Sequence, residues 1–413
     1  MTNHQTNANI VQNSWKKIVL LNFFGWIFIY ADRTILNPIM PNIQSHFDLN
    51  NSQLGLISSV FFLTYTFAQI PFAAIADYLG KKWVIGLGFV FFGLMTLLSG
   101  IVTTFGLFLL MRALTGIGEG TFYGPSFSLA SENIPTKKLT FGTALINSGQ
   151  AFGQAAGTLL SSFLVLQYNM HWSSPFIIIS IPTVLVGLMY LIFVNEKRRL
   201  KNLESNNLHS TMYQNSNNEL IKIDVKALFN KNLILTYLLL FASIYGQIAM
   251  LTWLPQFLIT DRGISGASVG WIASIVPFAS IPSSLIFARI NDKLSNPKLL
   301  LYILIPIAAL ALMIGMSINS YPVLIIALLV YGFTGKMAID PILLYTVNKN
   351  AKANQLSTTL GVYNFFGMIA SILAPYLTGV FIDLTGSMVI GFYFSAILLI
   401  LGLVGFSFVK YEK

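Results

Sequence analysis

Six charged residues lie inside stretches of this chain that are otherwise apolar enough to cross a membrane. They are Asp32, Arg33, Arg112, Glu119, Lys336 and Asp340. A charge at the centre of a membrane-spanning helix costs about 2.5–3.5 kcal/mol on insertion scales, so such residues persist mainly where they face an internal site and bind something. The six residues therefore predict a buried ionic site in a membrane protein.

Four of these charges fall in the first half of the chain, as two acids and two arginines. Asp32 and Arg33 are neighbours. Arg112 precedes Glu119 by seven residues, which places both on one helical face about 10 Å apart along the axis. A structural reading is that the four residues form two salt bridges that only neutralise each other. Buried ion pairs are often no more stabilising than packed apolar residues, so stability alone is a weak reason to keep them.

The charge balance of the six residues favours coupling to protons. Three acids and three bases sum to zero when all are ionised, so an incoming anion meets no net attraction. Protonating Asp32 and Glu119 leaves a surplus of positive charge. Burial favours the neutral form of a carboxyl group and a nearby arginine favours its charged form, so these acids can be poised to switch. Binding of an anion and of protons would then reinforce each other, as symport requires.

Lys336 and Asp340 stand four residues apart, so their side chains can meet on one helical face. The pair either neutralises itself without a ligand or leaves Lys336 to contact a second acidic or phosphoryl group, a role that suits a compact ammonium. If a zwitterion is carried instead, Asp340 or Asp32 could meet its ammonium group. Gln247, polar within an apolar run, either faces the ligand or bonds a neighbouring helix. The residues alone leave these readings open.

The composition indicates that membrane lipid is the main solvent of this chain. Hydrophobic residues make up 55% and charged residues 9% of the sequence, and the mean hydropathy is +0.71. Soluble domains carry about 25% charged residues. The 413 residues leave room for roughly a dozen spanning helices of about 20 residues each. Because the chain has no cysteine, disulfides and thiolate metal sites are excluded, and we expect no metal and no cofactor.

Twelve apolar runs divide into two sets of six. In the first half they lie near 17–40, 53–76, 83–105, 107–133, 141–166 and 175–194, and in the second near 232–259, 268–289, 299–317, 322–347, 357–382 and 388–409. The polar segment 195–231 is expected to be a solvated cytoplasmic linker, helical only around Ile221 to Phe229. We therefore predict an all-α integral membrane protein with two pseudo-symmetric six-helix bundles, residues 1–194 and 232–413.

The basic residues predict the orientation of the chain. Of the 24 Lys and Arg residues, Arg33, Arg112 and Lys336 lie within the spans, and only Arg262 is left for the loops on the side opposite the termini. Cytoplasmic loops carry the excess of Lys and Arg, so both termini should be cytoplasmic. The formal charge of +10 is thereby explained as a topology signal, which argues against nucleic-acid binding. Met1 to Asn13 lack the features of a signal peptide, so the first apolar run should remain as a helix.

Five segments of the sequence resemble the motifs of one transporter family. They are Asp32-Arg33, Ala73-Ala74-Ile75-Ala76-Asp77-Tyr78-Leu79-Gly80-Lys81-Lys82, Arg112-x6-Glu119, Leu251-Thr252-Trp253-Leu254-Pro255 and Gly361-Val362-Tyr363-Asn364-Phe365. The combination is similar to the anion:cation symporters of the major facilitator superfamily, which include sialin-like carriers and bacterial sugar-acid/proton symporters. The resemblance runs from about residue 18 to 405 and specifies the family but not the substrate.

The resemblance also implies roles for individual residues. Arg33 would bind the substrate carboxylate, with Tyr30 and Tyr65 as hydrogen-bonding neighbours and Asn364 contacting the ligand from the other half. Asp32 and Glu119 would be the proton-coupling acids. In the same scheme Arg112 would be the partner that tunes Glu119. Gln247 and Lys336 complete the predicted substrate contacts, while Asp77 and Asp340 are expected to have gating or structural roles.

Three residues depart from the family pattern. Ala73 and Tyr78 stand where the family has a glycine and an arginine, and Lys336 is unexpected at its position. The first two changes weaken that motif, although Asp77, Gly80 and the two lysines remain. The third change leaves the substrate open.

We therefore predict a transporter rather than an enzyme: a proton-coupled symporter that moves a small carboxylate or sugar acid by alternating access. The expected partners are this anion, protons and the lipid bilayer, with the protein a monomer in a bacterial inner membrane. The alternative is an amino-acid or other zwitterion transporter on the same scaffold. A membrane enzyme or a channel would need a catalytic constellation or a repeated polar lining. Drug/proton antiport has little use for Arg33 and Arg112.

Overall fold

The structure is a computed structural model that describes residues 3–135, 138–194, 225–294, 297–352 and 355–410. Its regular elements over these residues are helices. The first half contains α1 (Asn3–Ile35), the 3-10 helix η1 (Asn37–Ile39), α2 (Met40–Phe47), α3 (Asn51–Leu79), α4 (Lys81–Ser99), α5 (Phe105–Glu119), α6 (Tyr123–Asn133), α7 (Leu139–Ser161), the π-helix η3 (Ser162–Gln167) and α8 (Ser174–Phe193).

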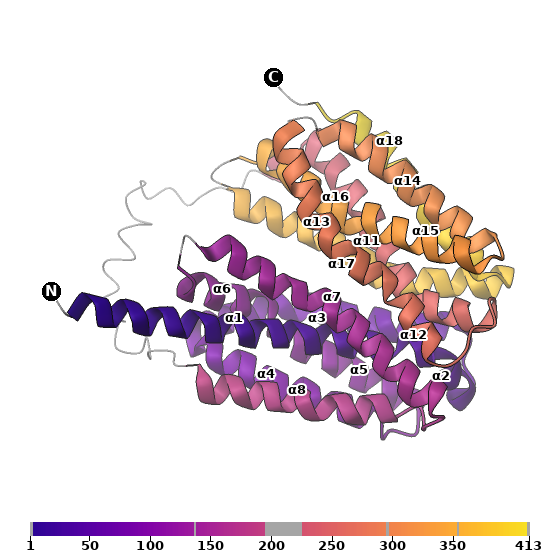
Figure 1. Cartoon of the computed structure of the whole chain (residues 1–413), viewed down its shortest axis with the longest axis horizontal. Helices are drawn as coiled ribbons and strands as arrows, with labels where there is room; N and C mark the ends of the chain where they lie inside the picture. Colours follow the sequence, from indigo (N-terminus) through magenta and orange to yellow (C-terminus); the bar gives the residue numbers. More distant parts are fainter. Residues whose placement is uncertain (1–2, 136–137, 195–224, 295–296, 353–354, 411–413) are drawn as a thin grey trace.

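The second half of the chain is built in the same way. It contains α10 (Val225–Leu228), α11 (Lys231–Thr260), α12 (Ala267–Ala273), α13 (Ile275–Leu294), α14 (Pro297–Ser317), α15 (Tyr321–Thr334), α16 (Lys336–Asn350), α17 (Leu356–Thr385) and α18 (Met388–Ser407). In Figure 1 the helices up to α8 lie together below those from α11 onward. Most of the expected linker, residues 195–224, lies outside the described residues. The boundaries 1–194, 195–231 and 232–413 stay a prediction.

Ten helices of the described residues are long and apolar enough to cross a membrane. The other two expected spans also form helices, but one is interrupted and the other carries more polar residues. The run 107–133 is divided after Glu119 into α5 and α6, and neither part has the length of a span. The run 141–166 begins within α7, which carries polar Asn147, Gln150 and Gln154 among its apolar residues and continues as a π-helix.

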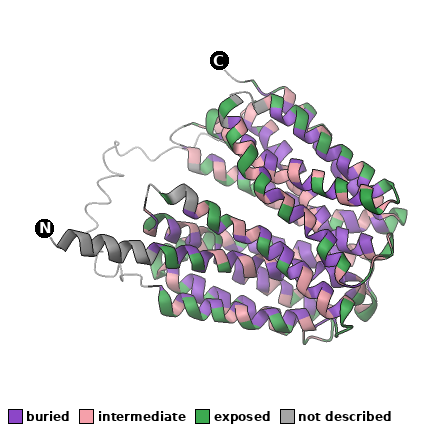
Figure 2. Ribbon diagram, in the orientation of Figure 1, coloured by how far each residue is buried: buried purple, intermediate pink, exposed green. Residues whose placement is uncertain are grey.

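Apolar side chains are exposed along the helices as well as buried between them. Figure 2 shows exposed positions recurring along the helices of both halves. Ile70, Ile192 and Leu401 are among the large apolar side chains with most of their surface uncovered. Since soluble monomers rarely expose large contiguous apolar patches, this surface fits a hydrocarbon solvent.

Within the first half, α1 and α7 approach backbone to backbone. A Cβ atom built on Gly153 would lie 2.3 Å from the carbonyl oxygen of Ile27, and one on Gly157 would lie 2.2 Å from that of Ala31. Small residues at this four-residue spacing allow such an approach between membrane helices. The contact fixes the part of α1 that carries the first two charged residues.

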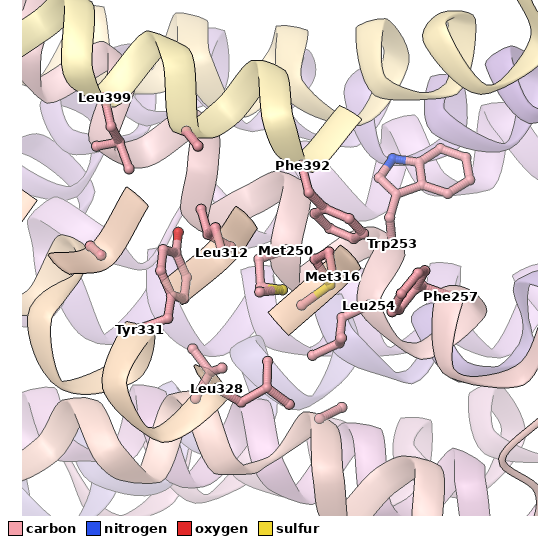
Figure 3. Packing of buried hydrophobic residues seen from close by; sticks show 14 of the residues in the cluster. Met250, Trp253, Leu254, Phe257, Leu312, Met316, Leu328, Tyr331, Phe392 and Leu399 are labelled. Carbon is pink, nitrogen blue, oxygen red and sulfur yellow. The ribbon is translucent and has the colours of Figure 1, made fainter. Parts of the chain in front are cut away.

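The second half has a large apolar core between α11, α14, α15 and α18. Figure 3 shows Met250, Trp253 and Leu254 of α11 beside Met316 and Phe392. The indole nitrogen Nε1 of buried Trp253 donates a hydrogen bond of 3.2 Å to the carbonyl oxygen of Pro375 on α17. This bond ties α11 to α17, the helix that makes the closest contacts with the first half.

The two halves meet closely where α3 packs along α17. A Cβ atom on Gly55 would lie 2.2 Å from the carbonyl oxygen of Pro375, and one on Gly379 would lie 2.3 Å from that of Asn51. These two positions lie toward the end of the molecule opposite the N-terminus, where the ribbons of the halves converge in Figure 1. Only glycine permits the observed separation of α3 and α17 there.

A second contact between the halves uses a backbone group that proline sets free. Pro255 has no N–H, so it cannot bond the carbonyl of Leu251 one helical turn earlier. The side-chain nitrogen Nδ2 of Asn37, from η1 in the first half, donates to that carbonyl oxygen at 2.8 Å. The bond therefore supplies a hydrogen-bond donor that α11 itself lacks.

The third contact is a carboxylate that caps a helix of the other half. Asp383, in the last turn of α17, accepts hydrogen bonds from the backbone N–H of Asn51 at 2.9 Å and of Ser52 at 2.8 Å. Asn50 caps the next N–H of α3, that of Gln53, at 2.8 Å. Because the first N–H groups of a helix have no partner inside it and attract negative charge, Asp383 completes the N-terminus of α3.

We predict that Asp383→Asn destabilises the contact between α3 and α17. Asparagine keeps one acceptor oxygen but loses the charge and the acceptor for Ser52, and losing a helix cap costs about 0.5–2 kcal/mol. The apparent Tm of the protein in nanodiscs should fall, as followed by tryptophan fluorescence. Asp261→Asn is the matched control, because the side chain of exposed Asp261, at the same end of the molecule, accepts a hydrogen bond only from its neighbour Thr260 among the described residues. Equal Tm values for the two variants would contradict the prediction.

Candidate functional site

The first ion pair joins α1 to α5. The Oδ2 atom of Asp32 lies 3.1 Å from Nη1 of Arg112, and the hydroxyl of Thr96 on α4 donates to Oδ1 of Asp32 at 2.7 Å. Both Asp32 and Arg112 are buried. The guanidinium of Arg112 also lies over the ring of Phe61, at 5.2 Å from its centroid. Both oxygens of Asp32 are thus hydrogen-bonded within the protein.

The second ion pair joins the next residue of α1 to the end of α5. Nε of Arg33 lies 2.8 Å from Oε2 of Glu119, and the Arg33 side chain is 10% exposed while that of Glu119 is fully buried. The guanidinium contacts two tyrosine rings, 4.4 Å from the centroid of Tyr65 and 4.8 Å from that of Tyr30. Cation–π contacts of this kind hold the cation in place when water is excluded.

Two buried atoms of this second pair are without a hydrogen-bond partner among the described residues. They are Nη2 of Arg33 and Oε1 of Glu119. Buried polar atoms are ordinarily paired, so an unpaired guanidinium nitrogen and an unpaired carboxylate oxygen on adjoining residues call for a functional explanation. The Arg33–Glu119 pair can therefore form further hydrogen bonds, whereas both oxygens of the Asp32 carboxylate are already bonded.

The two pairings leave the predicted tuning of Glu119 by Arg112 a prediction. Arg112 pairs directly with Asp32, and Glu119 pairs directly with Arg33. The reason is geometric. Arg112 and Glu119 are two turns apart on α5, too far to touch, whereas consecutive residues of α1 point about 100° apart. Each residue of α5 therefore meets a different residue of α1.

The second half contributes its own ion pair at a break in a helix. Nζ of Lys336 lies 2.5 Å from Oδ2 of Asp340, one turn along α16. Both side chains are half-buried, with 19% of Lys336 and 24% of Asp340 exposed. The expected pairing of Lys336 with Asp340 is present.

The helix breaks occur at matching places in the two halves. α5 ends at Glu119 after 15 residues, and α15 ends after 14 residues, just before Lys336 opens α16. Discontinuous helices at corresponding positions of two repeats are typical of transporter binding sites. The sequence showed the charged residues but not that the helices are interrupted beside them.

Three predicted site residues make no hydrogen bond or ion pair with these groups in the described part of the chain. Gln247 is half-buried on α11, Asn364 is exposed on α17, and Asp77 is exposed in the last turn of α3. The neighbouring Lys81 is paired instead with Glu132 of α6. The predicted roles of Gln247, Asn364 and Asp77 stay predictions.

One residue that was not predicted belongs to the site. The hydroxyl of buried Thr96 on α4 donates to Oδ1 of Asp32. Thr96 is a polar residue within the apolar run 83–105, and this is the signal that could have pointed to it.

Taken together, the fold and these buried ion pairs define a helical membrane carrier with discontinuous helices around an ionic site. The model of the Major Facilitator Superfamily matches residues 23–375 and 260–413. This chain belongs to that family, so it is an integral, multi-pass membrane transporter and not an enzyme. The match confirms the predicted family and fold class.

Comparison with individual proteins agrees with this membership. An uncharacterized transporter of Bacillus subtilis (strain 168) is 25% identical over 408 residues, covering 95% of this chain and 91% of the relative. The probable galactarate/D-glucarate transporter GudP of the same organism is 25% identical over 90% of this chain and 86% of its own length. The probable L-galactonate transporter of Escherichia coli (strain K12) is 24% identical over 89% and 83%, respectively.

Solved structures share the fold at lower sequence identity. A bacterial homologue of the human lysosomal transporter Spinster, in an inward-facing and occupied conformation, has a TM-score of 0.76 at 16% identity and covers 95% of this chain and 96% of its own. The xylose transporter XylE from E. coli, in an inward open conformation, has a TM-score of 0.75 at 15% identity, with 97% of each chain covered. These matches confirm the predicted all-α major facilitator fold.

We predict that the Asp32–Arg112 pair is strongly coupled. Removing one partner of a buried ion pair costs about 3–5 kcal/mol because the other charge is left uncompensated. Asp32→Asn and Arg112→Gln should each lower the Tm in nanodiscs sharply, and the double variant should be more stable than the sum of the two losses. Asp48→Asn, which changes an exposed carboxylate at a position whose φ of 55° suits asparagine, should change the Tm little. Additive effects of the two buried substitutions would refute the coupling.

Proposed function

We propose that this protein is a proton-coupled symporter of a small organic anion, a carboxylate or sugar acid, that works by alternating access. The observation that carries the proposal is Arg33, a buried guanidinium held by Glu119 and two tyrosine rings with one nitrogen left unpaired. The names of relatives such as GudP and the L-galactonate transporter support a sugar acid as the cargo class.

Arg33 is suited to anchor a carboxylate. A guanidinium presents its donors in a fixed plane that matches the two oxygens of a carboxylate. The rings of Tyr30 and Tyr65 contact the guanidinium and restrict its movement, so little side-chain freedom is lost on binding. Their hydroxyls, together with Gln247 and Asn364 from the other half, remain the proposed neighbours of the substrate.

Glu119 is the better placed of the two proposed proton-coupling acids. One of its oxygens binds Arg33 and the other has no partner in the described part of the chain, whereas both oxygens of Asp32 are bonded. A proton on Glu119 removes the negative charge that neutralises Arg33, so the guanidinium is freed for an anion. By reciprocity, a bound anion favours the protonated form of Glu119. In this scheme the Asp32–Arg112 pair holds α1 against α5 and contributes to the charge balance of the site.

The contacts between the halves support alternating access. The bonds of Asn37 to Leu251 and of Asp383 to the start of α3 gather at the end opposite the N-terminus. We propose that the basic loops and both termini lie in the cytoplasm, so that this end is the outer one, and contacts between the halves there are those expected of an inward-facing state. We propose a bacterial plasma membrane, with the two bundles 1–194 and 232–413 rocking about the site in a monomer. Asp77 and Asp340 would serve in gating or structure.

We predict that Arg33→Gln abolishes anion binding. In proteoliposomes, counterflow of galactonate and related sugar acids should be at least 10-fold weaker, because truncating one partner of a buried charge pair costs about 2–5 kcal/mol. Arg289→Gln is the matched control, since Arg289 is an exposed arginine on α13. A panel that includes zwitterionic amino acids tests the cargo class. The proposal would be overturned if the protein exchanged amino acids but no sugar acid. Full counterflow of sugar acids by Arg33→Gln would overturn it as well.

We predict that Glu119→Gln uncouples transport from protons. Glutamine cannot release a proton, so uphill accumulation driven by a lower outside pH should be abolished while exchange of the anion across the membrane persists. The measurement is accumulation in proteoliposomes with and without an imposed pH gradient. Asp48→Asn serves as control, because Asp48 is exposed and its φ of 55° suits asparagine. Unchanged uphill uptake by Glu119→Gln would show that coupling lies elsewhere.

A further inference from the structure

We propose that Asp383 and Gln167 form a gate at the end of the protein opposite the N-terminus. Each residue caps a helix of the opposite half, and both caps must break before the halves separate at this end. The inference rests on the alternating access of the proposed function. It adds two gating residues that belong to none of the ion pairs described above.

The first step is that the two caps occupy matching positions. α17 and the helix formed by α7 and η3 are the fifth apolar run of their halves, and α3 and α12 begin the second run. Asp383, in the last turn of α17, accepts hydrogen bonds from the N–H groups of Asn51 and Ser52 at the start of α3. Oε1 of Gln167, the last residue of η3, accepts a hydrogen bond of 3.2 Å from the N–H of Ala267, the first residue of α12. The second cap therefore repeats the first with the halves exchanged.

The second step is that the halves are closely packed beside each cap. A Cβ atom on Gly266 would lie 2.4 Å from Oε1 of Gln167, and one on Gly270 would lie 3.1 Å from Cα of Leu159 on α7. The φ of Gly266 is 63°, a conformation that glycine adopts without a steric cost. The approach of α3 and α17 beside Asp383 is equally close, as described above. Both caps therefore need the halves to touch, and a motion that separates the halves at this end breaks both.

The third step is that η3 ends at the capping residue. α7 continues from Ser162 to Gln167 as a π-helix. Turns of this kind are rare and are found frequently at functional sites. α12 begins with Ala267 at the end opposite the N-terminus, as Figure 1 shows. The interruption of regular α-helix thus coincides with the residue that reaches the other half.

The fourth step is that both caps can open and close reversibly. Asp383 and Gln167 are exposed, so water can bond each side chain and the N–H groups that it leaves. Asp383 also accepts a hydrogen bond of 2.9 Å from Nδ2 of Asn51. Because hydrogen bonds to a charged acceptor are stronger and the start of a helix attracts negative charge, Asp383 should hold the gate more firmly than the neutral Gln167.

The test measures the separation of the halves with spin labels. The chain has no cysteine, so cysteines introduced at Ser45 and Asp261 take the labels without background. Both positions are exposed, one on α2 of the first half and one after α11 of the second half. Double electron–electron resonance on the full-length protein in nanodiscs then gives the ratio of the open population, with the longer distance, to the closed one.

We expect Asp383→Asn to raise the ratio of open to closed protein at least about 3-fold, the size of effect that losing a helix cap has on an equilibrium. Adding Gln167→Ala should raise the ratio further. Adding Gln167→Glu instead should lower it again, because a carboxylate of the same shape strengthens the second cap. Thr385→Ala is the matched control in the last turn of α17, since the Thr385 hydroxyl bonds only Phe381 and Ser387 of its own half in the described part of the chain.

Opposite effects of the two substitutions at Gln167 distinguish a gate from general destabilisation, which would not be reversed by an added charge. An unchanged ratio in Asp383→Asn would overturn the inference, even if the Tm of that variant falls. The same conclusion follows if Gln167→Glu fails to lower the ratio, or if Thr385→Ala raises it as much as Asp383→Asn does.

The measurement needs no substrate, so its outcome is separate from that of the proposed function. If the ratio does not respond while Arg33→Gln abolishes counterflow of sugar acids, the gate fails and the symport of an organic anion stands. If the ratio responds as expected but the protein exchanges no sugar acid, the gate stands and the proposed cargo fails.

Discussion

Every charge buried away from water in this protein needs a partner, and the two crossed ion pairs between α1 and α5 meet that requirement. Asp32 with Arg112 and Arg33 with Glu119 fix both the axial position and the rotation of α1 against α5. α1 is held from its other side by Gly153 and Gly157 of α7, where no side chain fits between the backbones. The first half therefore presents its binding groups from a rigid frame, which is the condition for precise recognition of a ligand.

The contacts between the halves have a different physical character from those inside them. They consist of close backbone approaches and of hydrogen bonds to groups that helices leave unpaired, such as the Leu251 carbonyl freed by Pro255 and the first N–H groups of α3. Water or lipid head groups can replace such partners when the surfaces separate. The halves can therefore part at this end without exposing a buried charge, while the ion pairs within the first half remain intact.

The sequence predicted the fold and the charged members of the site because both depend on local properties. Apolar runs of about 20 residues and the cost of a charge within them are visible in the chain itself. The partners were not predictable, since the choice between Glu119 and Asp32 for Arg112 depends on how α1 is rotated against α5. For the same reason the sequence did not show that Thr96 of α4 bonds Asp32. The interruptions of the helices at Glu119 and Lys336 depend on tertiary packing as well.

The two halves also divide the chemistry unequally. In the first half each acid meets an arginine from a different helix, so a change in one residue disturbs a network of several helices. In the second half Lys336 and Asp340 lie on one helix, one turn apart, so their loss leaves the ion pairs of α1 and α5 in place. A substitution there therefore does not alter the frame that carries Arg33 and Glu119, on which the proposed coupling chemistry depends.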